Sequence, residues 1–146
     1  MHHMRTPILF AAAALAAPAT AAPQVMPGQW QSTSVVEHMT MPGMPPEALA
    51  MMKGRPTTVR YCLTPEEAAA DPRKLLNADK SCTVKRFTLN AGTIDAEMQC
   101  RTDQGPATIS MKGRYAADSY EMTSRMTNGP MTMQSRVTAR RLGPCK

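Results

Sequence analysis

Two turn signals in the C-terminal half of the chain, Ala117-Asp118 and Asn128-Gly129, place the strongest constraint on its fold. A two-residue turn fixes which residues of two strands face each other, and therefore which side chains share one face of a sheet. A turn at Ala117-Asp118 sets Ile109 opposite Met126, and a turn at Asn128-Gly129 sets Met126 opposite Met131. Because the two turns agree on one apolar face, we predict consecutive antiparallel strands on both sides of them.

The alternation of apolar and polar residues extends this pattern to most of the chain. From Cys82 onward it indicates five consecutive antiparallel strands, and two earlier strands are expected at 28–38 and 57–63. A change of phase within 82–90 indicates a β-bulge near Lys85-Arg86. We therefore predict a mostly β protein, with a single antiparallel curled sheet or half-barrel of about 6–7 strands around its apolar side and one or two short helices.

Two segments between the early strands favour short helices. Residues 46–52 begin with proline in the first turn and are followed by Gly54 as a stop signal. Residues 64–70 begin with Thr64, which can cap a helix, and Glu67 can reach back to the Thr64 amide. The neighbouring carboxylates Glu66 and Glu67 are explained by capping and by the helix dipole, so they do not indicate catalysis.

The first 21 residues are typical of a cleavable secretion signal. Arg5 is the only charged residue among the first 36, an apolar run follows it, and Ala19-Thr20-Ala21 matches the small-x-small pattern before a cleavage site. The apolar run is too short, and too interrupted by Pro18, for a transmembrane anchor. We therefore expect residues 1–21 to be removed and residues 22–146 to form a single disulfide-stapled β domain in the periplasm.

The four cysteines, Cys62, Cys82, Cys100 and Cys145, indicate two disulfides, because an even number in a small exported domain is typical of covalent staples. The close cysteine pairs that zinc sites use are absent from the sequence. We prefer Cys62–Cys82 with Cys100–Cys145, since one cysteine ends a strand and the next begins the following strand. The bulge register instead places Cys82 opposite Cys100, which leaves Cys62–Cys145 as the open alternative.

The predicted apolar face is rich in methionine, which outnumbers the aromatic residues with 14 Met against 1 Trp, 3 Tyr and 2 Phe in the whole chain. Methionine side chains adapt to irregular shapes. The face comprises Trp30, Tyr61, Ile94, Met98, Ile109, Met111, Tyr120, Met122, Met126, Met131 and Met133. We expect a non-enzymatic binding or envelope-maintenance module that takes an apolar ligand or envelope component there, the alternative being that these side chains form only the core.

Catalysis and nucleic-acid binding find no support in the sequence. His38 is the one histidine after the signal, the cysteines are expected to be paired, and neither a phosphate-binding loop nor a metalloprotease motif is present. The formal net charge of +6 is mild and spread along the chain, which is too diffuse for nucleic acid. We expect no catalytic residues, no cofactor and no nucleic-acid partner.

A second hypothesis concerns a soft metal ion. The residues His38, Met39, Met41 and Met44 gather one imidazole and three thioethers in a short segment. Cu(I) prefers such ligands. The alternative is an apolar connector that folds over the sheet.

A set of short motifs runs in order along the chain. They are Pro27-Gly28-Gln29-Trp30, Met41-Pro42-Gly43-Met44-Pro45, Tyr61-Cys62-Leu63-Thr64-Pro65-Glu66, Cys82-Thr83, Gly92-Thr93-Ile94, Cys100 and Arg141-Leu142-Gly143-Pro144-Cys145. This set resembles the exported bacterial family catalogued as domain of unknown function 3617. The resemblance implies a periplasmic protein of Gram-negative bacteria with one domain, no established activity and no assigned catalytic residues. It also implies that the methionine-proline segment belongs to the family's ordinary framework, which weakens the metal hypothesis.

Overall fold

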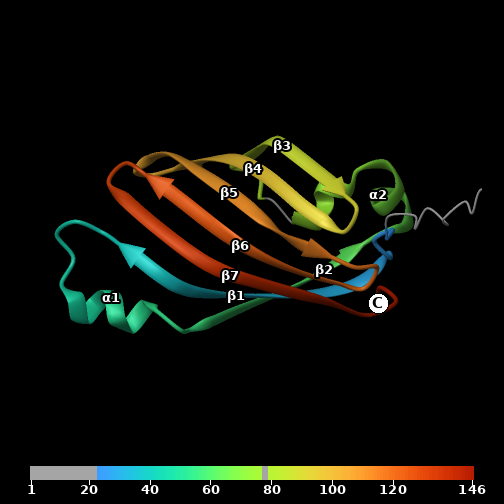
Figure 1. Ribbon diagram of the computed structural model, residues 1–146, viewed down its shortest axis with the longest axis horizontal. Coiled ribbons are helices and arrows are strands. Elements are labelled where there is room, and N and C mark those ends of the chain that lie inside the picture. The colour runs from blue at the N-terminus through green and yellow to red at the C-terminus, as the bar shows by residue number, and fades with distance from the viewer. Residues whose placement is uncertain (1–22, 77–78) are drawn as a thin grey trace, which may run out of the picture.

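The chain forms one curled, unclosed antiparallel sheet of seven strands (Figure 1). The computed structural model describes residues 23–76 and 79–146, so the predicted signal at 1–21 lies outside the described residues. The strands in chain order are β1 (Gly28–Thr40), β2 (Pro56–Leu63), β3 (Cys82–Asn90), β4 (Thr93–Thr102), β5 (Gly105–Tyr115), β6 (Ser119–Asn128) and β7 (Met131–Gly143). Their order in the sheet is β2-β1-β7-β6-β5-β4-β3, which confirms the predicted mostly β fold with a single antiparallel sheet.

Short helices lie in the two connections that flank β2. Helix α1 (Pro46–Met52) lies between β1 and β2, and α2 (Pro65–Ala70) is followed by the 3-10 turn η1 (Pro72–Leu76) on the way to β3. The capping box is present, because the Glu67 amide donates to Thr64 Oγ1 at 3.2 Å and the Thr64 amide donates to Glu67 Oε2 at 3.2 Å. Both predicted helices are confirmed. Within the described ranges, helices are too short or too polar to cross a bilayer.

The turn-based registers are confirmed at one hairpin and wrong by two residues at the other. Ile109 lies opposite Met126, as the first turn predicted. Met126 lies opposite Met133 and not Met131, because Asn128 still belongs to β6 and pairs with Met131. The Asn128 side chain is buried and donates to the hydroxyl of Thr102 at 2.9 Å, which holds it in the strand. A slip of two residues leaves every side chain on its predicted face.

All four cysteines form disulfides, but the preferred pairing is wrong. The bonds join Cys62 to Cys145 and Cys82 to Cys100. The preferred pairing required β2 and β3 to be neighbours, whereas they are the two edge strands with all the others between them. The predicted bulge is confirmed between Val84 and Arg86, and it sets Cys82 directly opposite Cys100.

The C-terminal tail crosses back over β1 to reach its cysteine partner. Gln29 of β1 pairs with Cys62 of β2 on one side and with Gly143 of β7 on the other. Two further residues therefore bring Cys145 to Cys62, and this bond joins the edge strand β2 to the end of the chain.

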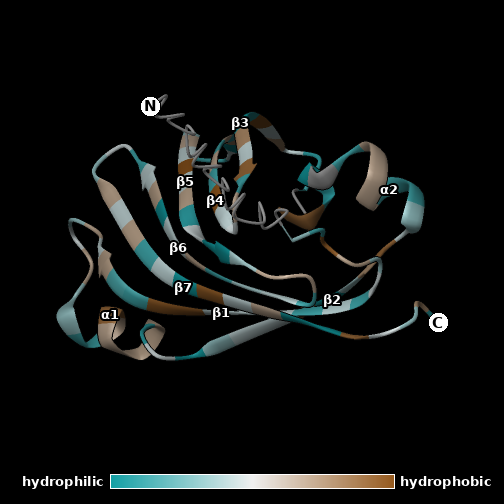
Figure 2. Ribbon diagram, turned by 45° about the vertical axis from the view of Figure 1, so that its right-hand side comes forward, coloured by the Kyte–Doolittle hydropathy of each residue, from teal (hydrophilic) through white to brown (hydrophobic). Residues whose placement is uncertain are grey.

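Apolar and polar residues alternate along the strands (Figure 2). The apolar side chains lie on the concave face, and the charged ones lie on the convex face. On the convex face Arg136 contacts Glu37 at 2.9 Å and Glu121 at 3.6 Å, and Arg86 contacts Asp95 at 2.7 Å. These charged side chains are all at least partly exposed to solvent. The ion pairs therefore stabilise the fold little, and this face stays hydrated.

Candidate functional site

A continuous row of apolar side chains crosses six strands on the concave face. Each member lies directly opposite the next in the register of the sheet. From β3 to β1 the row comprises Val84, Met98, Ile109, Met126, Met133 and Met39, and we call it the methionine row. Because these side chains share one face and one level of the sheet, they form a flexible apolar band.

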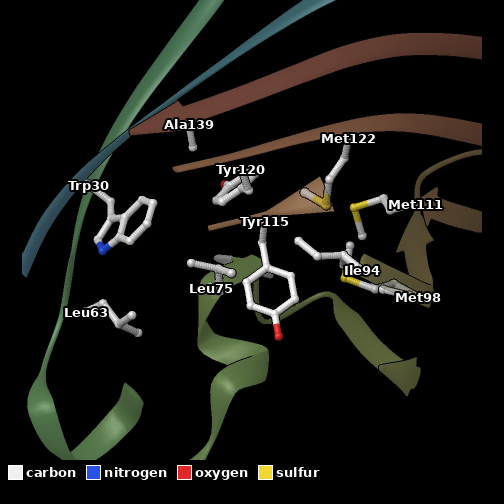
Figure 3. Packing of buried hydrophobic residues seen from close by; sticks show 11 residues of the cluster. Trp30, Leu63, Leu75, Ile94, Met98, Met111, Tyr115, Tyr120, Met122 and Ala139 are labelled. Carbon is white, nitrogen blue, oxygen red and sulfur yellow. The ribbon is translucent and has the colours of Figure 1, made fainter. Parts of the chain in front are cut away.

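An aromatic cluster lies on the same face, nearer the end of the sheet where β1 begins (Figure 3). Trp30 stacks on Tyr120 with ring centroids 6.0 Å apart. The Tyr61 hydroxyl donates to the carbonyl oxygen of Leu75 at 3.1 Å, and the Tyr120 hydroxyl lies 3.1 Å from the Tyr61 hydroxyl. Trp30 Nε1 donates to the carbonyl oxygen of Met26 at 3.1 Å. The polar atoms of these rings are thus satisfied inside an apolar cluster, and burial raises the pKa of Tyr61 far above its ordinary value.

Small side chains lie between the methionine row and the aromatic cluster. Ser124 and Ser135 lie opposite each other on β6 and β7, and Ser34 lies opposite Val137 one step further on. Gly113 lies opposite Met122, and a Cβ atom at this position would overlap the backbone of β6 at the Glu121 carbonyl and at Met122. Between the methionine row and the aromatic cluster, small residues thus alternate with the bulky Val36, Met111, Met122 and Val137. We call the small positions Ser34, Gly113, Ser124 and Ser135 the floor.

Leu75 covers the aromatic end of the concave face. It comes from η1, is 1% exposed, and packs in the same cluster as Trp30 and Tyr120 (Figure 3). The methionine row is less enclosed, because Ile109, Met126 and Met133 are only half-buried. The α2–η1 connection thus completes a core at one end and leaves the other end of the face less covered by the described part of the chain.

A cavity of about 470 Å³ lies between the edge strands β2 and β3 and the α2–η1 connection. Its walls include Tyr61 of the aromatic cluster and Val84 of the methionine row. The hydrogen bond from the Arg73 guanidinium to Asp71, 2.7 Å long, lowers the pKa of that carboxyl group. The full lining comprises Tyr61, Cys62, Glu67, Asp71, Arg73, Lys74, Cys82, Thr83 and Val84. The gap between the edge strands is therefore lined by both charged and apolar side chains.

The register places every residue predicted for the apolar face on the concave side, on strands β1, β2 and β4 to β7. Trp30, Ile94, Met98, Met111, Tyr120 and Met122 are buried there. Tyr61, Ile109, Met126, Met131 and Met133 are half-buried. Sequence reasoning missed Leu75, and the apolar pair Leu75-Leu76 within a polar connector was the available signal.

The residues of the copper hypothesis are not all brought together. A bulge lies between Val36 and His38, after which His38 pairs with Gln134 and Met39 pairs with Met133. Consecutive strand residues point to opposite faces, so the His38 imidazole lies on the convex side and Met39 on the concave side. Among residues 23–76 and 79–146, His, Cys, Asp and Glu side chains form no group of three or more that could hold a metal ion.

The comparisons with known proteins agree with the fold pattern and motifs. The sequence profile of the family described as "Protein of unknown function (DUF3617)" matches residues 25–145. Neither a curated protein nor a solved structure gives a significant match to the chain. Because the profile spans all seven strands, both helices and all four cysteines, the chain belongs to the DUF3617 family.

Proposed function

We propose that this protein is a non-enzymatic binding module that takes an elongated amphiphilic ligand, such as a single acyl chain with a polar head, on its concave face. The observation that carries the proposal is the arrangement of that face. Most of the methionine row is only half-buried, and beside it the small residues of the floor alternate with bulky apolar residues. Binding sites for apolar ligands combine apolar walls with a few polar groups.

The polar groups lie where an amphiphile needs them. The hydroxyls of Ser34, Ser124 and Ser135 line the floor, and Arg73 and Lys74 line the gap between the edge strands. In this gap Arg73 is paired with Asp71 and Lys74 lies 3.9 Å from Glu67, so a polar head group there would meet both signs of charge. Methionine suits a site for acyl chains because its flexible thioether adapts to chains of different shape.

We also propose that the protein acts in the periplasm. Two disulfides are typical of an oxidising compartment, and the first 21 residues are typical of a secretion signal. N-terminal sequencing of the protein from a periplasmic fraction should give Ala22-Pro23. An uncleaved product in the membrane fraction would contradict this part of the proposal.

Ligand binding can be tested with Trp30, the one tryptophan of the chain, as the fluorescence donor. The probe is dansyl-labelled undecanoic acid, titrated into the folded protein while energy transfer from Trp30 to the dansyl group is measured. Trp30 is 0% exposed and lies on the concave face, so efficient transfer requires a probe bound nearby. We expect saturable transfer.

Two leucine substitutions on adjacent residues separate the concave face from the rest of the surface. Ser124→Leu fills the floor and should weaken probe binding about tenfold or more. Thr123→Leu adds the same side chain on the convex face and should leave affinity unchanged. Urea unfolding and far-UV circular dichroism check that both variants fold. Equal affinity in the two variants, or no saturable transfer in the wild type, would refute the proposal.

A further inference from the structure

Helix α1 and its flanking turns, residues 41–55, form an apolar projection at the end of the molecule away from α2 (Figure 1), and we call it the α1 tip. The chain leaves β1 at Thr40, turns through a hydrogen bond from the Met44 amide to the Met41 carbonyl, and returns where the Gly54 amide donates to the carbonyl of Val36. The tip is thus anchored at its base.

The side chains of α1 contribute nothing to the core. The helix has seven residues, all described, and none of them is buried. Met51 is 66% exposed and Met52 is 42% exposed. A helix this short is not stable by itself in water, and apolar side chains that stay exposed add no burial energy to the fold. An apolar helix held out from the fold in this way marks an interaction surface.

The charges around the tip select its partner. Glu47 is the one acidic residue between 38 and 65, whereas Lys53 and Arg55 follow the helix directly and are both exposed. An apolar patch with a basic border matches the interface of an anionic bilayer, where apolar side chains enter the acyl boundary and cations contact phosphate groups.

We propose that the α1 tip docks the protein onto anionic lipid membranes, with Leu49, Met51 and Met52 inserted at the headgroup boundary and Lys53 and Arg55 against the lipid phosphates. The interaction is peripheral and reversible, because the inserted segment is short and the basic border is small. It is independent of ligand binding on the concave face, so either proposal can fail without the other.

The test is flotation of the processed protein, whose N-terminus is verified by mass, with vesicles of defined composition. Vesicles of phosphatidylglycerol and phosphatidylethanolamine should carry the protein to the top of the gradient, and phosphatidylcholine vesicles should carry much less. Binding should fall as salt rises, because screening weakens the contacts of Lys53 and Arg55.

Two matched variants place the interaction on the tip. Met51→Glu/Met52→Glu should reduce binding to anionic vesicles about tenfold or more. Leu142→Glu introduces the same side chain at an exposed apolar position of β7, 44% exposed, and should bind like the wild type. All the substituted residues are exposed, so thermal unfolding should confirm that both variants fold.

The contrary outcomes are distinct. No flotation of the wild type, or equal flotation of the tip variant, would overturn the proposal, and the latter would place the membrane contact elsewhere on the protein. Equal binding to both vesicle types would remove the role of the basic border. If sedimentation shows a wild-type dimer that the tip variant dissociates, the partner is a second copy of the chain and the membrane proposal is wrong.

Discussion

Removing the disulfide between Cys62 and Cys145 should destabilise the fold strongly, although both cysteines are exposed and neither contributes to the core. Serine at both positions removes few packing contacts from the folded state. The loss of stability therefore comes from the greater conformational entropy of the unfolded chain without the bond. The bond closes a loop of 83 residues. In the loop-entropy description, opening such a loop costs about 4.5 kcal/mol of folding free energy at 25 °C. Small domains have only about 5–15 kcal/mol in total, so the double variant should be marginally stable.

The assay is urea unfolding of the Cys62→Ser/Cys145→Ser variant, followed by the fluorescence of buried Trp30. The midpoint should fall sharply, and the denaturant dependence should become steeper, because an unfolded chain without the staple exposes more surface. Leu142→Ser removes an exposed side chain near the tail and should change stability by no more than about 0.5 kcal/mol. If the double variant loses less than about 1 kcal/mol of unfolding free energy and its dependence on urea concentration is unchanged, an effect through the unfolded chain is refuted.

Two further outcomes follow from the concave face. Gly113→Ala should lower the unfolding free energy by about 1–3 kcal/mol, because its Cβ overlaps the backbone of β6, and a melting temperature equal to that of the wild type would contradict the register of β5 and β6. Burial raises the pKa of Tyr61 in the folded state above its ordinary value of 10.0, so the folded state binds this proton more tightly and loses stability as pH rises above that value. Tyr61→Phe should lower the unfolding free energy by about 1 kcal/mol at pH 7 through its lost hydrogen bonds. Between pH 9 and pH 11, however, the variant should lose less stability than the wild type in urea titrations. Equal losses of stability in the two proteins over this range would count against the buried hydroxyl.

Local signals in the sequence predicted the parts of the fold that depend on neighbouring residues. The capping box at Thr64 and Glu67 and the turn at Ala117-Asp118 are each contained within a few positions, and each is confirmed. The bulge after Val84 was visible because one strand changed phase against its own hairpin partner. The concave face followed from the same alternation, which a register slip of two residues does not disturb.

Long-range pairing was the part that local patterns could not supply. The position of β1 between β2 and β7 depends on residues at opposite ends of the chain, and the alternation of both strands fits many partners. The wrong preference for Cys62–Cys82 came from this gap, since it assumed that strands consecutive in sequence are neighbours. The predicted apolar face omitted Leu75 for a related reason. Its burial depends on how the connection from β2 to β3 crosses the open side of the sheet.

The place of β1 in the sheet has a consequence for the order in which the protein folds. Strands β3 to β7 are joined by short turns and can form early, whereas Glu37 of β1 and its partner Arg136 of β7 are 99 positions apart. Until β1 arrives, β7 is an unprotected edge that invites aggregation. We expect pulse-labelled hydrogen exchange to show protection in β4 to β6 before β1, and early protection of β1 would reverse this order. The pair β1–β2 then covers the edge of β7 late in folding. Aggregation should therefore compete with folding most strongly before this pair docks.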